Sequence, residues 1–506
     1  FWNIEPNRII DALLEGGATL FDYEIVDVDG DGGDDFVKQL VQGSNQWIVS
    51  KNQGNSRAQL NSITDAKGKT TTFEYSNASD SAIYTASENS VEGELVIRGG
   101  YPLASSVTIE DSSSASNVRE QKTFKYENIR LNLFGRGLLG SEKFTVDNAI
   151  LNTSVETQFH QDFPLIGREK AIKSKVSGIK LSESSTEWLA STSAPYQVTL
   201  DTVTLKGYEQ SPNTAYVETE TDYTFDDYGN MIGQSVVVTD LLNDDTEVSE
   251  YTYSATYPFE SGYNSIADWT ISFAKTQTET WSRTSNASNL DIRSVTNRSL
   301  TKTYTQYLDT LRPSSEVVST PSGDLTTTYD YDLFGNITSV SSNSAEDGLL
   351  TVTYSDFEND KWPKTITNSH FGEAVTTTRT YDGRYGGVTS TNDYAGIVTS
   401  TEFDAFGRVS SQADALNNET TIQYGWCVAG ISDCAVDVSG TLASYFVTTN
   451  TPGAPEVTEY YDTFSNKVKV KQAGFSNSEY IYQQWGYDTA GRLTEESIPA
   501  FTFPVT

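Results

Sequence analysis

Tyr331-Asp332-Leu333-Phe334-Gly335-Asn336-Ile337-Thr338 is a stretch that recurs, with variations, along this 506-residue sequence. In it, an aromatic residue and an aspartate are followed by a glycine. The same three residues in further copies are Phe225, Asp226 and Gly229; Phe403, Asp404 and Gly407; and Tyr487, Asp488 and Gly491. Two copies are degraded: Tyr461-Asp462 has Ser465 in the glycine position, and Tyr381-Asp382 is followed by the displaced Gly386 and Gly387. A unit repeated over most of a chain predicts a repeat architecture.

One unit has the pattern of a β-hairpin. The residues from Thr326 to Tyr331 are rich in β-branched and aromatic side chains, which suit a half-buried strand. Asp332 can accept hydrogen bonds from backbone amides two residues on, and Gly335 can supply the positive φ of a hairpin loop. We therefore interpret the repeat aspartates as turn formers and the tyrosines as packing between successive hairpins.

The composition favours an all-β fold. The chain has 29 Tyr and 22 Phe, and each unit supplies two or three strands. The predicted product is a long, curving antiparallel sheet whose units bury their aromatic residues against the neighbouring turn. No apolar run approaches the roughly 18 residues that a membrane-spanning helix needs.

The net charge of −35 excludes one large class of partner. Nucleic acids are bound by clustered Lys and Arg, which displace counterions from the phosphates. A strongly acidic chain lacks that surface, and its charge instead favours solubility.

An aspartate-rich loop near the N-terminus predicts a calcium site. Calcium prefers oxygen ligands, and aspartates stand at alternate positions of a glycine-bearing loop. The expected ligands are the side chains of Asp27, Asp29, Asp31 and Asp35 and the carbonyl of Gly33. Lys38 stands where an EF-hand needs a glutamate, which excludes that framework. The alternative is an acidic, solvated turn without a metal.

The two cysteines, Cys427 and Cys434, lie seven positions apart. No third cysteine or nearby histidine completes a zinc site. A local disulfide that closes a small loop fits a secreted protein. Two buried free thiols are the alternative.

Signals of catalysis are weak. Neither His160 nor His370 has a serine or cysteine at the spacing of a known catalytic motif. No glycine-rich phosphate loop occurs. Carboxylates are so numerous that the sequence singles out no pair of the kind that glycosidases use.

Taken together, the repeat units resemble the RHS or YD-repeat family, most closely its toxin-complex B components and related shells of secreted polymorphic toxins. The aspartate loop is similar to the FG-GAP calcium loop of integrin-like β-propellers. Apart from the Tyr-Asp units, the resemblance rests on Gly135-Arg136-Gly137-Leu138-Leu139-Gly140, on Gln161-Asp162-Phe163-Pro164 with Gly167-Arg168, and on Trp426-Cys427 followed by Tyr445-Phe446-Val447-Thr448-Thr449.

The resemblance implies an all-β fold in which a spiralling antiparallel strip of YD-repeat hairpins forms a shell, preceded by the end of a β-propeller-like module. We expect a propeller-like segment at 1–57, an irregular β region at 58–300 and a regular YD-repeat region at 301–506. No autoprotease segment of the kind that ends such shells precedes Thr506. We therefore expect a fragment that holds the tail of the propeller and the first half of a shell.

The function implied by the resemblance is encapsulation, without catalysis, of a toxic C-terminal polypeptide for delivery by a secreted or cell-surface protein. The implied partners are the remainder of the shell, the enclosed cargo and other toxin-complex subunits. One alternative is a cell-surface adhesion protein that binds glycans or proteins. A carbohydrate-active enzyme with two catalytic carboxylates is the other.

Overall fold

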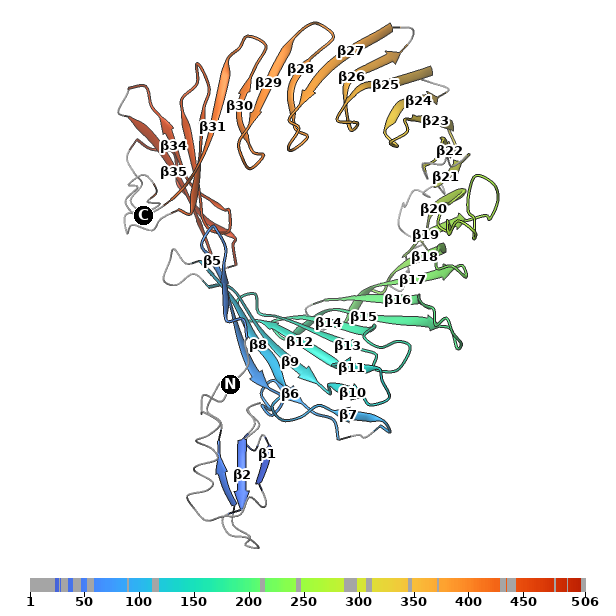
Figure 1. Ribbon diagram of the computed structural model, residues 1–506, viewed down its shortest axis with the longest axis vertical. Coiled ribbons are helices and arrows are strands. Elements are labelled where there is room, and N and C mark those ends of the chain that lie inside the picture. Colours follow the sequence, from blue (N-terminus) through green and yellow to red (C-terminus); the bar gives the residue numbers. More distant parts are fainter. Residues whose placement is uncertain are drawn as a thin grey trace. The chain divides into compact units, whose positions relative to one another are not determined.

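The computed structural model describes residues 23–26, 28, 35–39, 47–51, 59–88, 91–111, 118–209, 214–242, 247–285, 298–305, 312–344, 348–370, 373–427, 434, 443–476, 479–488 and 490–501. The regular elements within these ranges are the strands β1 to β36, so the predicted all-β fold is confirmed (Figure 1). The described residues contain no helix long and apolar enough to cross a membrane.

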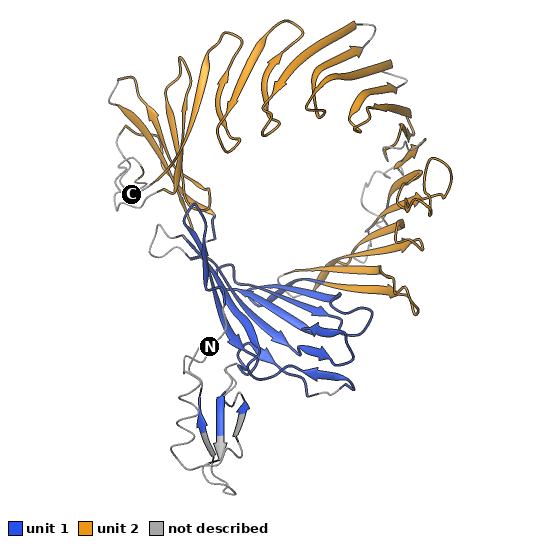
Figure 2. Cartoon of the chain, viewed as in Figure 1, with its two compact units in different colours: residues 1–183, 489–491 blue, residues 184–488, 492–506 orange. Residues whose placement is uncertain are grey.

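The chain divides into two compact units (Figure 2). Unit 1 comprises residues 1–183 with 489–491, and unit 2 comprises 184–488 with 492–506. The strand β15 (Ile179–Ala190) contains the boundary between them. The three segments expected from the sequence stay a prediction.

Unit 1 begins with a three-stranded antiparallel sheet made of β1 (Tyr23–Val26), β2 (Asp35–Gln39) and β3 (Trp47–Ser50). A larger sheet follows. In spatial order its strands are β4 (Ser62–Thr64), β5 (Lys69–Asn77), β8 (Pro102–Asp111), β9 (Val118–Glu127), β12 (Lys143–Asn148), β13 (Thr153–Phe159) and β14 (Glu169–Val176). The short β6 (Tyr84–Thr85) pairs with β9 in parallel.

A third sheet of unit 1 contains β7 (Glu94–Val96), β10 (Arg130–Asn132) and β11 (Gly137–Gly140). The small core of this unit is a cluster of Ala78, Tyr84, Leu103 and Ile129. The Tyr84 hydroxyl lies within the cluster, donates to the Ile97 carbonyl at 2.7 Å and accepts from the Ile129 amide at 3.2 Å. The buried hydroxyl is thus satisfied, as burial requires.

Unit 2 is a curving antiparallel sheet in which each strand pairs with the next along the chain (Figure 1). Its first strands are β16 (Val198–Tyr208), β17 (Ala215–Phe225), β18 (Met231–Asp240), β19 (Glu247–Thr256), β20 (Thr276–Ser285), β21 (Arg298–Tyr304) and β22 (Ser315–Thr320). The next are β23 (Gly323–Tyr331), β24 (Ile337–Ser344), β25 (Gly348–Glu358), β26 (Trp362–His370), β27 (Glu373–Tyr381), β28 (Val388–Asn392) and β29 (Val398–Phe403). The last are β30 (Val409–Ala413), β31 (Glu419–Trp426), β32 (Tyr445–Asn450), β33 (Val457–Tyr461), β34 (Lys467–Ala473), β35 (Tyr480–Tyr487) and β36 (Leu493–Glu496).

Because the strands of unit 2 run up and down in chain order, their connections alternate between the two edges of the sheet. The turns at Asp332, Asp382 and Asp404 join β23–β24, β27–β28 and β29–β30, so they share one edge. We call this the Tyr-Asp edge. The connections β22–β23, β26–β27, β28–β29 and β30–β31 lie at the opposite edge.

Candidate functional site

Asp332 closes the turn between β23 and β24 with both of its carboxylate oxygens. Its Oδ1 accepts hydrogen bonds from the amides of Phe334 at 2.9 Å and Asn336 at 2.8 Å. Its Oδ2 accepts from the Asn336 Nδ2 at 2.8 Å. The Asn336 side chain, joined by the turn amides, lowers the pKa of Asp332 against the opposing effect of burial. The carboxylate is therefore engaged within its own turn.

The other predicted turns repeat this geometry. The side chains of Asp226, Asp404, Asp462 and Asp488 each accept from the amide four residues on, at 2.8–3.0 Å. An Asn or Arg at that position also donates to the second carboxylate oxygen: Asn230, Arg408, Asn466 and Arg492. The glycine position has positive φ in each: Gly229, Gly335, Gly407, Gly491 and the substituted Ser465.

Asp382 forms a turn that is one residue longer. Its amide donates to the Gly387 carbonyl at 2.8 Å, and Gly386 supplies the positive φ of 73°. The Arg384 Nη2 donates to its Oδ2 at 2.7 Å, and the Arg384 amide donates to its Oδ1 at 2.8 Å. The Arg384 side chain and amide lower the pKa of Asp382 to about 2.

The Tyr-Asp pattern does not predict the aspartate turns at Asp393 and Asp414. Asp393 and Asp414 accept from the amides two and four residues on, at 2.8–2.9 Å, and they lie at the opposite edge of the sheet. The sequence signal for these turns is an aspartate with a residue suited to positive φ three positions later. Gly396 takes this position after Asp393, and Asn417 takes it after Asp414. Neither aspartate is preceded by an aromatic residue, so the Tyr-Asp pattern passed over both.

Three tyrosines of the repeat tie their hairpin to an earlier one. Tyr331, Tyr381 and Tyr487 each donate their hydroxyl to a backbone carbonyl 18–20 residues upstream, at 2.8–3.0 Å. Asn336 also reaches a neighbouring turn, because its Nδ2 donates to the Asp360 carbonyl at 2.8 Å. The repeat therefore holds itself together through side-chain bonds to backbone groups.

In the repeat copies that have phenylalanine in place of tyrosine, the ring packs against its neighbours but donates no hydrogen bond. The Phe225 ring stacks on Tyr223 with their centroids 6.4 Å apart. The Phe403 ring lies against Gly387, where any side chain larger than a hydrogen atom would collide with it. Close packing thus explains why Gly387, which is displaced from the repeat position, is a glycine.

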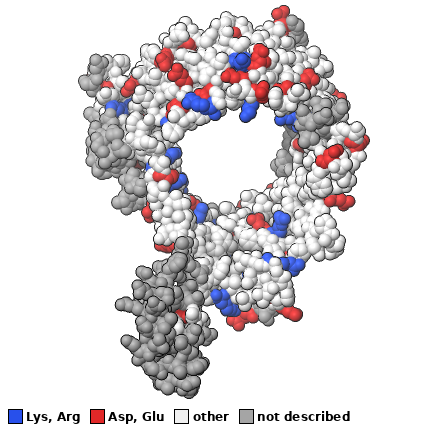
Figure 3. Space-filling model, viewed as in Figure 1, with Lys and Arg blue, Asp and Glu red and all other residues white. Residues whose placement is uncertain are grey.

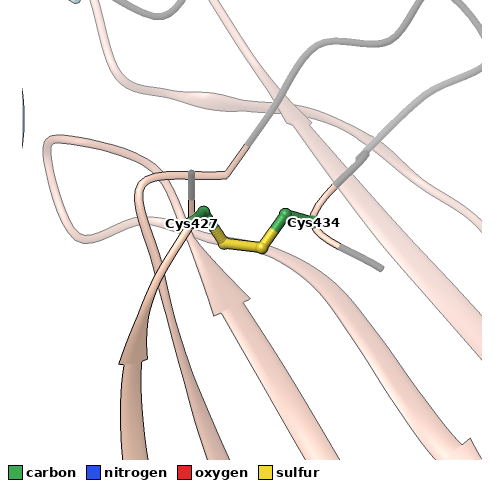
Figure 4. Close-up of a disulfide and its surroundings, with 2 residues drawn as sticks. All are labelled: Cys427 and Cys434. Carbon is green, nitrogen blue, oxygen red and sulfur yellow. A yellow bond between two sulfur atoms is a disulfide. The ribbon is translucent and has the colours of Figure 1, made fainter. Parts of the chain in front are cut away.

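The structure contains the disulfide Cys427–Cys434, and both residues belong to one packed cluster (Figure 4). Cys434 is fully buried with Ala443 and Tyr460. The Cys427 amide donates to the Ser444 carbonyl at 2.9 Å, and the Ser444 amide donates to the Tyr461 carbonyl at 2.7 Å. The disulfide thus anchors the β31–β32 connection against β33.

Tyr461 stacks on Tyr445 with their centroids 4.9 Å apart, and its hydroxyl donates to Glu459 at 2.9 Å. Burial and the Glu459 carboxylate raise the pKa of Tyr461. The hydroxyl therefore keeps its proton and acts as a hydrogen-bond donor at neutral pH.

Two segments singled out in the sequence meet in unit 1. The Gln161 Nε2 donates to the carbonyls of Gly140 at 2.8 Å and Asn128 at 2.7 Å. The Arg136 guanidinium lies 3.9 Å from the centroid of the Phe163 ring, in cation–π contact. These residues form a structural joint between β11 and the segment after β13.

The structure describes the side chain of His160 but not that of His370. The His160 Nδ1 lies 3.3 Å from Asp162 Oδ1. The His370 side chain lies outside the described residues.

Of the five predicted calcium ligands, the structure describes only Asp35. Its side chain is fully buried, and its Oδ2 accepts from the Val28 amide at 2.9 Å. Asp27, Asp29, Asp31 and Gly33 lie outside the described residues. Within the described residues, no three His, Cys, Asp or Glu side chains are grouped as a metal site.

No protein-family model and no curated protein matches the chain. Solved structures match its fold. TcdB2-TccC3 without its hypervariable C-terminal region matches 93% of the chain with a TM-score of 0.58 at 10% identity, and TcdB2-TccC3 matches 93% with 0.57 at 11%. The Photorhabdus luminescens Tc holotoxin pore matches 94% of it with a TM-score of 0.54 at 10% identity.

The chain spans about a third of the length of these solved structures, because the matches cover 33–34% of each. The chain shares the fold of the matched third of each solved structure. The predicted fold class, a strip of antiparallel hairpins of the kind found in toxin-complex shells, is confirmed at this level.

Proposed function

We propose that this chain is a non-catalytic segment of a structural shell, of the RHS or YD-repeat type, that encloses a polypeptide cargo for delivery. Its partners would be the remainder of the shell, the cargo and other toxin-complex subunits. The protein would act after secretion or at a cell surface, where the Cys427–Cys434 disulfide is stable.

One observation carries the proposal: the fold match to TcdB2-TccC3 over 93% of the chain. The chemistry of the turns supports the same conclusion. Asp332 and Asp404 accept amide protons inside their own turns. A carboxylate occupied in this way maintains the scaffold and is a poor general base.

Protease protection tests encapsulation. The protein is purified under native conditions from the cells that make it, treated with proteinase K, and then unfolded for mass spectrometry. We expect a second polypeptide, or a second segment, that resists digestion until the sheet is unfolded. Digestion of every co-purifying polypeptide at the rate of an unfolded control would contradict the proposal.

We also propose a structural calcium ion in the loop from Asp27 to Asp35. Asp35 supports this proposal, because its carboxylate is fully buried and belongs to the aspartate-rich loop. The other aspartates of the loop are near in sequence and offer the oxygen ligands that calcium prefers.

A melting experiment tests the calcium proposal. Because calcium binds the folded state, added calcium raises the Tm, and Asp29→Ala removes most of that rise. Asp65→Ala is the matched control. Asp65 serves a turn elsewhere, where it accepts from the Lys67 amide at 2.9 Å, so its loss leaves the calcium-dependent rise intact. An unchanged Tm after addition of chelator to the intact protein would refute the proposal.

A further inference from the structure

The last strands of unit 2 share a row of side chains that we call the buried row. The strand register aligns five residues on one face of β31 to β35: Gly425, Phe446, Tyr460, Lys469 and Gln484. The Phe446 ring lies against Gly425, and its centroid is 5.9 Å from that of Tyr460. Tyr460, Lys469 and Gln484 are 3%, 1% and 9% exposed. Side-chain packing therefore joins these five strands in addition to their backbone ladders.

Lys469 shows how completely the buried row is closed to water. Lys and Arg side chains are visible at many places on the surface of the protein, as their charge favours (Figure 3). Lys469 is buried instead, and its Nζ lies 4.0 Å from the centroid of the Tyr460 ring, in cation–π contact. The burial of this lysine therefore depends on Tyr460 remaining in its place.

The Cys427–Cys434 disulfide braces the buried row. Cys427 directly follows β31, and the fully buried Cys434 packs in one cluster with Tyr460 of β33. The disulfide therefore ties the end of β31 covalently to a side chain packed on β33, across β32. The Cys434 carbonyl also accepts from the Ala443 amide at 2.9 Å. Once the S–S bond is broken, this hydrogen bond and the packing of one small side chain are the described contacts of Cys434.

The two cysteines of the disulfide differ in their accessibility to solvent. Cys427 is half-buried and follows the exposed Trp426, whereas Cys434 is fully buried. A small thiol in solution therefore reaches Cys427 first. Its thiolate attacks the Cys427 Sγ, the S–S bond breaks, and Cys434 leaves as a thiolate that takes up a proton. A second thiol then displaces the first from Cys427. Two external thiols are thus oxidised to one disulfide, while the protein gains two electrons and two protons.

We propose that the Cys427–Cys434 disulfide is a redox-sensitive latch on the last strands of unit 2. In an oxidising medium, such as the outside of a cell, the disulfide keeps Cys434 packed on Tyr460 and the buried row closed. In a reducing compartment, thiols break the bond, and the buried row becomes accessible to water. The proposal goes beyond the proposed shell and does not require an enclosed cargo.

Amine labelling of the full chain tests the latch. The natively purified protein is treated with dithiothreitol, without denaturant, and then with a short pulse of an amine-acylating reagent. Mass spectrometry gives the labelled fraction of each lysine. We expect the labelling of Lys469 to rise at least about tenfold, because removal of a cross-link favours local opening by more than that factor. Lys302 of β21 is the internal control, since its side chain is 37% exposed already and is labelled equally in both states.

Hydrogen exchange separates local opening from general unfolding. We expect the amides of β33 and β34 to exchange at least about tenfold faster after reduction, and those of β23 and β24 to exchange as before. The double variant Cys427→Ser with Cys434→Ser should show the reduced behaviour with or without dithiothreitol. A Lys469 that stays protected when both thiols are free would overturn the proposal. So would a disulfide that dithiothreitol does not reduce in the folded protein, or exchange that accelerates equally in β23.

Discussion

The repeat aspartates act as backbone clamps. In the turn at Asp332, one carboxylate oxygen accepts two amide hydrogen bonds and the other binds the side chain four residues on. At that fourth position, Asn336 donates to the second carboxylate oxygen from its side-chain amide. In the turn at Asp404, Arg408 donates to the same oxygen from its guanidinium. The exchange of Asn for Arg preserves the clamp while changing the charge at the edge of the sheet.

Gly335→Val is predicted to lower the free energy of unfolding by about 1 kcal/mol or more, because a β-branched residue is strained at positive φ. Gly335 has a φ of 82°. Gly383→Val is the matched control, since Gly383 lies in a comparable turn without positive φ. Urea unfolding of both variants measures the difference. Equal losses in the two variants would refute the assigned cause.

Asp382→Asn is predicted to change how stability depends on pH. The pKa of Asp382 is lowered from 3.8 to about 2 by Arg384, so its charge stabilises the folded state above about pH 4. This contribution is lost as the pH falls from about 4 towards 2. The Tm difference between wild type and variant should therefore be largest above pH 4, small near pH 2 and absent below it. A difference that is constant from pH 6 to pH 2 would contradict this account.

At this scale the sequence revealed the turns that combine all three signals: an aromatic residue, an aspartate and a glycine. It did not reveal Asp414, because Asn417 takes the positive φ there without a glycine. It also did not explain Gly387, whose role depends on contact with the ring of Phe403 in another hairpin. The sequence therefore predicted the turns themselves, but it did not predict the packing between strands.

The hairpins of unit 2 are held together by bonds between turns as well as by the strand ladders. Tyr381 shows this directly: its hydroxyl donates to the Pro363 carbonyl at 2.8 Å, and its ring stacks on Trp362 with their centroids 6.0 Å apart. Tyr381 therefore joins the first residues of β26 in two ways. Phenylalanine at the same repeat position retains only the packing.

Tyr381→Phe is predicted to lower the free energy of unfolding by about 1 kcal/mol, since one hydrogen bond to a backbone carbonyl is lost while the ring remains. Tyr394→Phe is the control, because Tyr394 is largely exposed in the described structure. Thermal and urea unfolding measure both variants. The interlocking role fails if the two substitutions cost the same.

The element type was predictable because alternating Thr and aromatic residues suit strands throughout the chain. Most of the strand order of unit 2 follows from short connections, which place successive strands side by side. The joint between Gln161 and Gly140 was not predictable, because it brings together segments separated by a strand pair. The resemblance named both segments without indicating that they touch.

At the scale of the whole molecule, the sequence predicted the fold class but not the two compact units. Their boundary falls within the continuous strand β15, where neither composition nor a linker marks it. The fold match to about a third of TcdB2-TccC3 is the basis for the proposed shell. A shell made of a sheet has one consequence that can be tested at neighbouring residues: only one face of the sheet lies towards the enclosed polypeptide.

Photo-crosslinking from neighbouring positions of β27 tests this central claim most directly. Thr377 and Thr378 are adjacent in the strand, so their side chains lie on opposite faces of the sheet. A crosslinking residue is placed at each position in turn in the natively purified protein, and crosslinked polypeptides are identified by mass spectrometry. The account predicts that the cargo is captured from one of these positions and not from the other. Equal capture from both faces, or capture from neither, would contradict it.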